Sequence, residues 1–432
     1  MTSADVSTPP RVAESIRPLS GYERLFWAVD RVHGFNFSIA VSFAGNLAHA
    51  RWRAGFDQAQ ARHPFLDTCL NTEDAQAPFF VRGEGLRIPI AFRRRDSSTE
   101  WQRAMEAGYT ELFDQAAAPL LRAVVLEDEQ GCDLILTANH VVIDGVGLLG
   151  FIRDLLRALA GKTLPSLPAP PSAENRVAQL RPASGKPVPA QDAAAPALAK
   201  EAAPTRPARA FERHRSGGRP AVGAIRFSPE ETALLLQCCR REQTTAGAAL
   251  LAAITCALRE LSPLLEQAEI HLVAPVDARP YLDNTEDFVL SIITARAVST
   301  APEPDLWTSA RALRTQLAPF LSIEAIEATY DRVQAMLDKR LEASVLVEAL
   351  IQGFGHDASL SNLKNAEFPV VPEGLTVQSV WGPSVLLGVQ GEHFIGSATF
   401  GGALHLVYTS YTPVAGLLEA VRRILVGACK NA

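Results

Sequence analysis

The sequence predicts a mixed α/β protein made of two lobes, and three observations support this fold class. The chain has 432 residues, more than a single hydrophobic core usually serves. Short runs of branched apolar residues, typical of strands, alternate with longer runs that have helical apolar spacing. A stretch rich in proline and alanine, residues 164–218, separates the two halves of this pattern.

The composition describes an ordinary globular protein. Hydrophobic residues make up 47% of the chain and charged residues 20%, with a formal net charge of −6, so a large core is available. No run of lysine and arginine stands out, which argues against binding to nucleic acid. The six cysteines form no C-x-x-C pair and no zinc-type spacing with histidine. They predict buried reduced thiols in a reducing cytoplasm, and no metal site.

Four segments are expected along the chain. Residues 1–17 predict a flexible tail, because they lack the apolar core of a secretory signal. Residues 18–163 are expected to form an N-terminal lobe and residues 219–432 a C-terminal lobe. The segment 164–218 predicts an exposed, partly extended linker, because proline fixes φ and removes backbone donors. The most apolar helical run, residues 246–258, is too short to span a bilayer and predicts a buried core helix.

Capping signals and apolar spacing mark the elements of the N-terminal lobe. Ser20, with Glu23 three residues later, is typical of a helix start, and Pro64 lies just past an amphipathic run. Two branched apolar runs flank a polar turn and predict a hairpin. The elements expected in order are a helix after Ser20, a strand at 35–43, a helix at 48–63, strands at 120–126 and 133–138, and a helix at 146–159 that ends at Gly161.

The C-terminal lobe repeats the pattern of strands interleaved with amphipathic helices. Ser228 is typical of an N-cap, with Pro229 at the first helical position. The other elements expected in order are the helix at 246–258, strands at 269–275 and 288–297, helices at 307–320 and 326–337, and strands at 375–380, 394–400 and 403–408.

The segment that carries chemistry is Asn139-His140-Val141-Val142-Ile143-Asp144-Gly145, which follows the second strand of the expected hairpin. A neutral imidazole accepts protons near physiological pH, so a histidine at a strand end suits general-base chemistry. Asp144 either orients the imidazole or pairs with a distant arginine to brace the loop, and Gly145 permits a tight bend. The spacing alone is not specific, since a lone histidine is more often structural.

Residues 136–148 resemble the signature of the condensation-domain and CoA-dependent acyltransferase superfamily, whose fullest form is H-H-x-x-x-D-G. Residues 18–26 resemble the opening of the polyketide-associated and wax-ester-type acyltransferases, and residues 52–66 resemble their first helix, which ends in His-Pro. Residues 275–280 are similar to the P-V-D-x-R element, and residues 361–363 to the S-N-hydrophobic element. The resemblance therefore spans nearly the whole chain.

The resemblance implies two similar lobes of the chloramphenicol acetyltransferase type. They would meet in a V as a pseudo-dimer with a central tunnel, in a monomeric protein. By the same resemblance, His140 would be the general base near the middle of the tunnel. Asp144 would be a structural residue in a salt bridge with Arg279, and Gly145 would keep the loop close to the reaction centre.

Three further residues are candidates for the tunnel or for stabilising an oxyanion. Asn139 stands where the fullest signature has its first histidine, a position that is usually structural. Ser361 and Asn362 are candidate oxyanion donors by resemblance. A Ser-Asn turn that caps the local backbone is an equally good interpretation of this pair.

The function implied by the resemblance is acyl transfer from a thioester, either acyl-CoA or acyl-phosphopantetheine on an acyl or peptidyl carrier protein, to a small-molecule alcohol or amine. The thioester is a co-substrate, and no bound cofactor, metal or covalent acyl-enzyme is expected. Natural-product or lipid biosynthesis is the implied context, with a free-standing ester-forming enzyme favoured. Two alternatives stay open: a condensation catalyst that joins carrier-bound substrates, and a non-catalytic relative that docks a carrier protein or partner enzyme.

Overall fold

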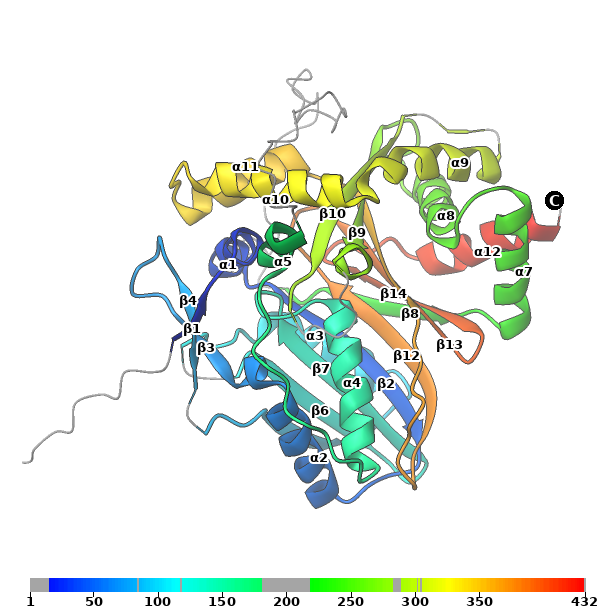
Figure 1. The fold of residues 1–432 in the computed structure, drawn as a ribbon. Helices are drawn as coiled ribbons and strands as arrows, with labels where there is room; N and C mark the ends of the chain where they lie inside the picture. The colour runs from blue at the N-terminus through cyan, green and yellow to red at the C-terminus, as the bar shows by residue number, and fades with distance from the viewer. Residues whose placement is uncertain are drawn as a thin grey trace, which may run out of the picture.

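Two large β-sheets, each covered by helices, form the body of the protein and confirm the predicted α/β class (Figure 1). A small third sheet consists of β1 (Ser15–Pro18), β4 (Phe79–Arg82) and β3 (Thr68–Asn71). The structure is a computed structural model, and it describes residues 15–83, 85–116, 119–180, 218–282, 289–300, 302–303 and 305–430.

The first large sheet positions the predicted motif. Its strands, in spatial order, are β12 (Thr376–Val385), β2 (Asn36–Ala44), β7 (Gly131–Asn139), β6 (Leu121–Glu127) and β5 (Ile90–Arg94). Neighbouring strands are antiparallel, except for the parallel pair β5 and β6. The predicted hairpin is therefore confirmed as β6 and β7, and every residue of β7 is buried.

Helices cover both faces of this sheet. The predicted helices at 48–63 and 146–159 are confirmed as α2 (His49–Arg62) and α4 (Gly145–Leu159), which pack together in one core with Phe37 and Ile39 of β2. Helix α3 (Glu100–Thr110) packs in another core with Ala40 of β2. Because successive side chains of a strand point to opposite faces, these helices lie on opposite sides of the sheet.

The second large sheet has six strands and mixed pairing. In spatial order they are β10 (Ile292–Ser299), β9 (Ile270–Asp277), β11 (Ala358–Asn365), β13 (His393–Phe400), β14 (Ala403–Ser410) and β8 (Ala221–Arg226). Strand β11 runs parallel to both of its neighbours, and the other pairs are antiparallel.

Two groups of helices cover the second sheet. The first group shares one core with the sheet and consists of α7 (Pro229–Arg241), α8 (Ala246–Leu261), α9 (Leu306–Leu317) and α12 (Leu417–Lys430). The second group consists of α10 (Ile323–Leu337) and α11 (Ala343–Phe354), which pack against α1 (Gly21–His33). Short 3-10 turns occur at Pro64–Asp67, Arg279–Tyr281 and Ala318–Phe320.

The predicted helix starts are confirmed at atomic detail. Ser20 and Ser228 each accept a hydrogen bond from the backbone of the residue three positions on, and that residue, a glutamate in both cases, bonds back to the cap. Helix α8 is almost entirely buried, as expected. Within the described residues no single helix is long and apolar enough to cross a membrane, although α7 and α8 together pass on length and composition, with a 102° bend between them.

One strand of the expected C-terminal lobe lies in the sheet of the N-terminal lobe. Strand β12 comes from the segment 219–432 but pairs with β2, with Ser384 opposite Ser38 and Val385 opposite Phe37. Figure 1 shows β12 running along the edge of the first sheet, beside β2. The two halves are therefore joined by backbone hydrogen bonds as well as by side-chain packing.

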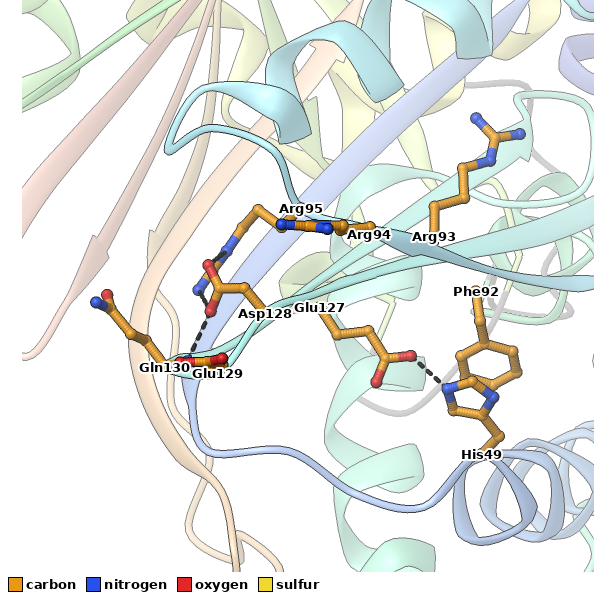
Figure 2. A pocket seen from close by; sticks show the side chains of 9 residues that line it. All are labelled: His49, Phe92, Arg93, Arg94, Arg95, Glu127, Asp128, Glu129 and Gln130. Atoms are coloured by element: carbon orange, nitrogen blue, oxygen red, sulfur yellow. Dashed lines mark hydrogen bonds and ion pairs between the residues drawn. The ribbon is translucent and has the colours of Figure 1, made fainter.

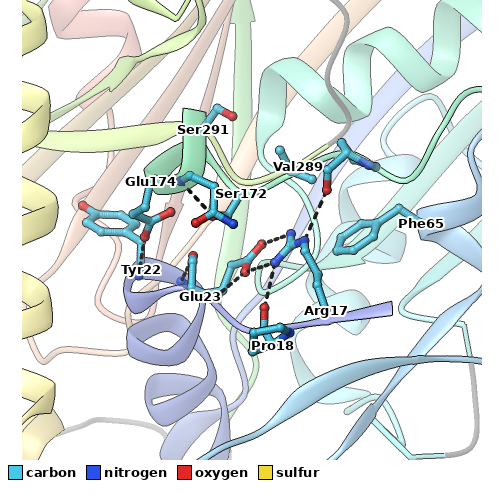
Figure 3. A network of polar contacts seen from close by, with 12 residues as sticks. Arg17, Pro18, Tyr22, Glu23, Phe65, Ser172, Glu174, Val289 and Ser291 are labelled. Carbon is cyan, nitrogen blue, oxygen red and sulfur yellow. Dashed lines mark hydrogen bonds and ion pairs between the residues drawn. The ribbon is translucent and has the colours of Figure 1, made fainter. Parts of the chain in front are cut away.

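The expected exposed linker is wrong for residues 173–180, whereas residues 165–171 form neither helix nor strand and are largely exposed, as predicted. Residues 173–180 form helix α5 (Ala173–Leu180), in which Ala173 and Val177 are buried. Four residues apart on a helix, they present one apolar face, which packs with α1 and α10. Figure 3 shows how Glu174 reaches α1, where it accepts a hydrogen bond from the backbone of Tyr22 at 2.8 Å. Residues 181–217 of the linker and the first 14 residues of the expected tail lie outside the described residues. Residues 15–17, the end of the expected flexible tail, belong instead to strand β1, which pairs with β4.

Candidate functional site

The motif loop leaves β7 and holds the His140 imidazole in one orientation. The backbone nitrogen of His140 donates to the carbonyl of Phe35 at 2.8 Å. Nδ1 lies 3.0 Å from the carbonyl oxygen of Ile143, and because a carbonyl only accepts, Nδ1 carries the proton. Nε2 of the neutral ring is then left with the free lone pair, as a general base requires.

Three phenylalanine rings surround this imidazole. Their centroids lie 4.9 Å (Phe26), 5.0 Å (Phe35) and 4.6 Å (Phe37) from that of His140. Burial lowers the pKa of His140 to about 4, while the charge of Asp144 acts in the opposite direction. The imidazole is therefore neutral at physiological pH.

The imidazole is buried without being sealed. His140 is 8% exposed, and within the described residues Nε2 has no hydrogen-bond partner. Although it is unpaired, Nε2 is not cut off from solvent. This nitrogen therefore keeps limited access from outside, which a reacting group needs.

The ion pair expected between Asp144 and Arg279 is present and joins the two halves of the chain. Nη1 and Nη2 of Arg279 each donate to the carboxylate at 3.0 Å, and both side chains are almost fully buried. The carboxylate also accepts from the backbone of Gly147 at 2.9 Å and of Ser291 at 2.8 Å. Arg279 donates further to the carbonyl of Val289 at 2.7 Å. Asp144 therefore braces the loop and forms no hydrogen bond with the imidazole.

Two glycines near the loop lie close to neighbouring side chains. Gly145 does not have the left-handed φ expected from a tight bend. Instead, a Cβ at this position would lie 3.1 Å from Leu363, a tight approach. Sequence reasoning missed Gly147, where a Cβ would lie 2.8 Å from Ile143 and 3.4 Å from Arg279. The Gly-Val-Gly pattern is visible in the sequence, but the reason for glycine at position 147 is seen only from its contacts in the structure.

The side chain of Asn139 holds the loop. Its Nδ2 donates to Asp30 at 2.9 Å, and its Oδ1 accepts from the backbone of Val141 at 3.0 Å. Asn139 is fully buried. Both of its polar groups are thus engaged within the protein, which fits the structural interpretation of this position.

The Ser361–Asn362 pair lies in β11, where the hydrophobic residue that follows it approaches the motif loop. Asn362 is exposed, and its Oδ1 accepts from the backbone of Lys364 at 2.8 Å, as in the local turn considered as an alternative. Lys364 has a φ of 58°, and the strand register shifts at this point. Within the described residues no hydrogen bond links Ser361 or Asn362 to His140, whereas Leu363 lies against Gly145.

A surface hollow of about 900 Å³ lies at the other end of the first sheet. Figure 2 shows its lining, with His49 paired to Glu127 and Arg95 paired to Asp128. Strand β7 has nine residues, so its two ends are roughly 30 Å apart. The hollow lies beside the first residue of β7, and His140 follows the last, so the hollow is remote from the imidazole.

Comparisons with known proteins identify the family and similar folds. The profile of the Condensation domain matches residues 27–289, and that of the phthiocerol/phthiodiolone dimycocerosyl transferase C-terminus matches residues 216–412. Polyketide synthase associated protein 5 from Mycobacterium tuberculosis has a TM-score of 0.66 at 20% identity, covering 96% of this chain and 98% of that one. The trichothecene 15-O-acetyltransferase TRI3 from Fusarium sporotrichioides has a TM-score of 0.64 at 13% identity, covering 98% and 100%.

Curated relatives match a smaller region. The hybrid PKS-NRPS synthetase mpsA of Macrophomina phaseolina (strain MS6) is 27% identical over 165 residues, which is 36% of this chain and 4% of that protein. Tyrocidine synthase 2 of Brevibacillus parabrevis is 24% identical over 168 residues, 38% of this chain and 5% of that protein. The chain thus spans only a few per cent of the length of these synthetases. The first profile covers more than half of the chain, and the chain therefore belongs to the condensation-domain family.

Proposed function

We propose that the protein is an acyltransferase that moves an acyl group from a thioester to the hydroxyl or amine of a small acceptor, with His140 as general base. The observation that carries the proposal is the neutral imidazole, tied through Nδ1 to the carbonyl of Ile143 and accessible at Nε2. Membership of the condensation-domain family supports acyl transfer in natural-product or lipid biosynthesis. The thioester donor is acyl-CoA or a carrier-bound acyl-phosphopantetheine.

The chemistry requires one proton to travel through Nε2 of His140. The acceptor gives its proton to Nε2 as its oxygen or nitrogen attacks the thioester carbonyl, which becomes a tetrahedral oxyanion. When this intermediate collapses, the carbon–sulfur bond breaks and the proton passes from Nε2 to the departing sulfur. The products are an ester or amide and a free thiol, and the imidazole returns to its neutral form.

The surroundings of His140 serve both stages of this cycle. Burial keeps the ring unprotonated before the attack. During the attack the ring becomes positive, and the negative charge of Asp144 favours that form. Arg279 holds the Asp144 carboxylate in place, so the position of this charge is fixed before the reaction starts.

The phenylalanines around His140 favour apolar substrates. Phe26, Phe35 and Phe37 offer no hydrogen-bonding groups, so a polar part of a substrate would lose its hydration there without compensation. An acyl chain or an apolar acceptor has no such hydration to lose when it lies against these rings. We therefore propose that the groups next to the reacting carbonyl are mainly hydrocarbon.

A donor and acceptor panel tests the proposed function. The purified protein is incubated with acyl-CoA thioesters of graded chain length, and with the same acyl groups on a phosphopantetheinylated carrier protein. Each donor is combined with alcohols and amines, and products are identified by mass spectrometry. We expect an ester or amide accompanied by an equal amount of free thiol. If no pair gives product while the protein binds the carrier protein, the docking alternative is correct and the acyltransferase proposal is wrong.

A further inference from the structure

A carboxylate outside the motif, that of Asp30, is bonded to two of the segments that hold the imidazole. Asp30 lies near the end of α1. Its Oδ1 accepts hydrogen bonds from the backbone nitrogen of Phe35 and from Nδ2 of Asn139, the latter at 2.9 Å. Its Oδ2 accepts from the side chain of Gln115, whose Oε1 in turn accepts from the indole of Trp27.

Each of these two segments acts on His140 by a different contact. Phe35 stacks on the imidazole at 5.0 Å with an interplanar angle of 29°, and its carbonyl accepts from the backbone of His140 at 2.8 Å. Asn139 precedes His140 and bonds through Oδ1 to the backbone of Val141. A single oxygen of Asp30 thus fixes both the ring that stacks on the imidazole and the residue before it.

We propose that Asp30 is a positioning residue for His140, which it serves through Phe35 and Asn139. The inference rests on the proposed acyltransferase function, because positioning matters only if Nε2 must meet a reacting group. Asp30 is bonded to the neighbours of the imidazole, Phe35 and Asn139, and not to the ring itself. Its effect on His140 therefore passes through these two segments. A displacement of about 1 Å at a reacting group costs on the order of 100-fold in rate, so small movements of these segments are sufficient.

The proposal also accounts for asparagine at position 139. An amide donates through Nδ2 and accepts through Oδ1 at the same time, and it does both here, to Asp30 and from Val141. Asparagine does not titrate, whereas a histidine changes its donors and acceptors near neutral pH. Asn139 therefore offers the same donor and the same acceptor throughout the pH range in which His140 works.

The substitution Asp30→Asn tests the proposal, because it keeps the size of the side chain and replaces one acceptor by a donor. We expect kcat to fall about 10- to 100-fold while KM changes by less than about threefold, as for a misplaced catalytic group. Asp133→Asn is the matched control. Asp133 is also buried, lies on β7 and is bonded to Arg95 at 3.2 Å, but it is six residues from Asn139. Its loss should leave kcat unchanged.

A rescue experiment separates positioning from general loss of stability. Asn139→Asp places a second carboxylate against Asp30 and should lower kcat strongly. Asp30→Asn combined with Asn139→Asp removes the repulsion between two carboxylates and places a donor opposite the acceptor at position 139, although the same amide nitrogen then faces the backbone N–H of Phe35. This double variant should regain at least about tenfold in kcat over Asn139→Asp alone, since the coupling of contacting residues is measured in this way.

A spectroscopic measurement makes the test independent of catalysis. Histidine labelled with ¹³C at Cε1 gives one signal for each ring, and the His140 signal is assigned by its loss in His140→Ala. We expect Asp30→Asn to shift this signal and Asp133→Asn to leave it in place. If Asp30→Asn does not fold, Asn139→Ser, which is too short to reach Asp30, should show the same shift and the same loss of kcat.

The outcomes distinguish this inference from the proposed function. Wild-type kcat with an unmoved His140 signal in the folded variant would overturn the role of Asp30 and leave the acyltransferase proposal intact. A wild-type protein that transfers no acyl group would contradict the proposed function. The His140 signal would then decide separately whether Asp30 sets the imidazole position.

Discussion

At position 140, burial and one hydrogen bond decide the charge and the orientation of the imidazole. Burial disfavours the charged ring, and the carbonyl of Ile143 fixes the proton on Nδ1. The general-base role proposed for His140 came from the resemblance, because an H-x-x-x-D-G spacing is common by chance. Arg279, the partner of Asp144, was predictable from the order of the elements that resemble the family. The contribution of Asp30 was not, since Asp30 and Asn139 are 109 positions apart and meet only in the folded protein.

The pH dependence of acyl transfer follows from the pKa of His140. Because burial lowers this pKa to about 4, the neutral base predominates at any higher pH. With an alcohol acceptor, which does not titrate in this range, we therefore expect kcat/KM to be constant from about pH 8 to about pH 5 and to fall below that range as the ring is protonated. Rates are measured after diluting protein kept near neutral pH into each buffer. A limb centred near the ordinary histidine value, about 6.5, would contradict the buried environment.

His405 should make the fold sensitive to acid. It is fully buried, and neither ring nitrogen makes a well-aligned hydrogen bond within the described residues. Burial lowers its pKa to about 4, so the unfolded chain binds a proton more readily than the folded one, and stability falls as the pH drops from about 6.5 towards 4. His405→Leu should raise the free energy of unfolding by about 1–3 kcal/mol, and by more at acidic pH. Urea denaturation at neutral and acidic pH measures this, and an equal or lower stability of the variant would count against it.

At the scale of elements, the start of α4 is fixed from the other half of the chain. Asp144 caps α4 through the backbone of Gly147, and the same carboxylate receives Arg279 from a 3-10 turn and the backbone of Ser291 beside β10. One side chain thus ends the motif loop, starts a helix and binds the opposite half. This arrangement gives the ion pair mainly a structural role.

Breaking this pair should affect stability more than chemistry. Arg279→Met would leave the Asp144 carboxylate buried without its cation, which typically costs about 3–5 kcal/mol. We expect a correspondingly lower midpoint in chemical denaturation, with kcat reduced much less in the molecules that remain folded at low temperature. Adding Asp144→Asn should recover part of the stability. Wild-type melting together with greatly reduced turnover would show that the pair acts on the chemistry instead.

Elements with strong local signals were predictable from the sequence, and elements defined by distant contacts were not. The β6–β7 hairpin, α2, α4 and the capped start of α7 each carry apolar spacing or a capping box that acts within a few residues. Helix α5 was missed because its apolar face consists of only Ala173 and Val177, within a proline-rich stretch. Its helical form depends on packing against α1 and α10.

At the scale of the whole molecule, two elements that pack with the opposite half of the chain join the halves around His140. Strand β12 enters the first sheet beside β2, and α1 packs with α10 and α11. Phe26 on α1 and Val385 on β12 each pack against the cores of both halves. A division at the linker was the natural expectation from composition. Composition could not predict these contacts between the halves, because strand pairing depends on partners that are far apart in the chain.

The central claim is that the imidazole of His140 removes the acceptor's proton. The most direct test compares kcat for wild-type protein and His140→Ala, with the donor and acceptor pair that gives the most product and with folding checked by circular dichroism. Loss of a positioned general base should lower kcat by about 100- to 10,000-fold while KM changes little. A folded His140→Ala protein that transfers the acyl group at the wild-type rate would contradict the account.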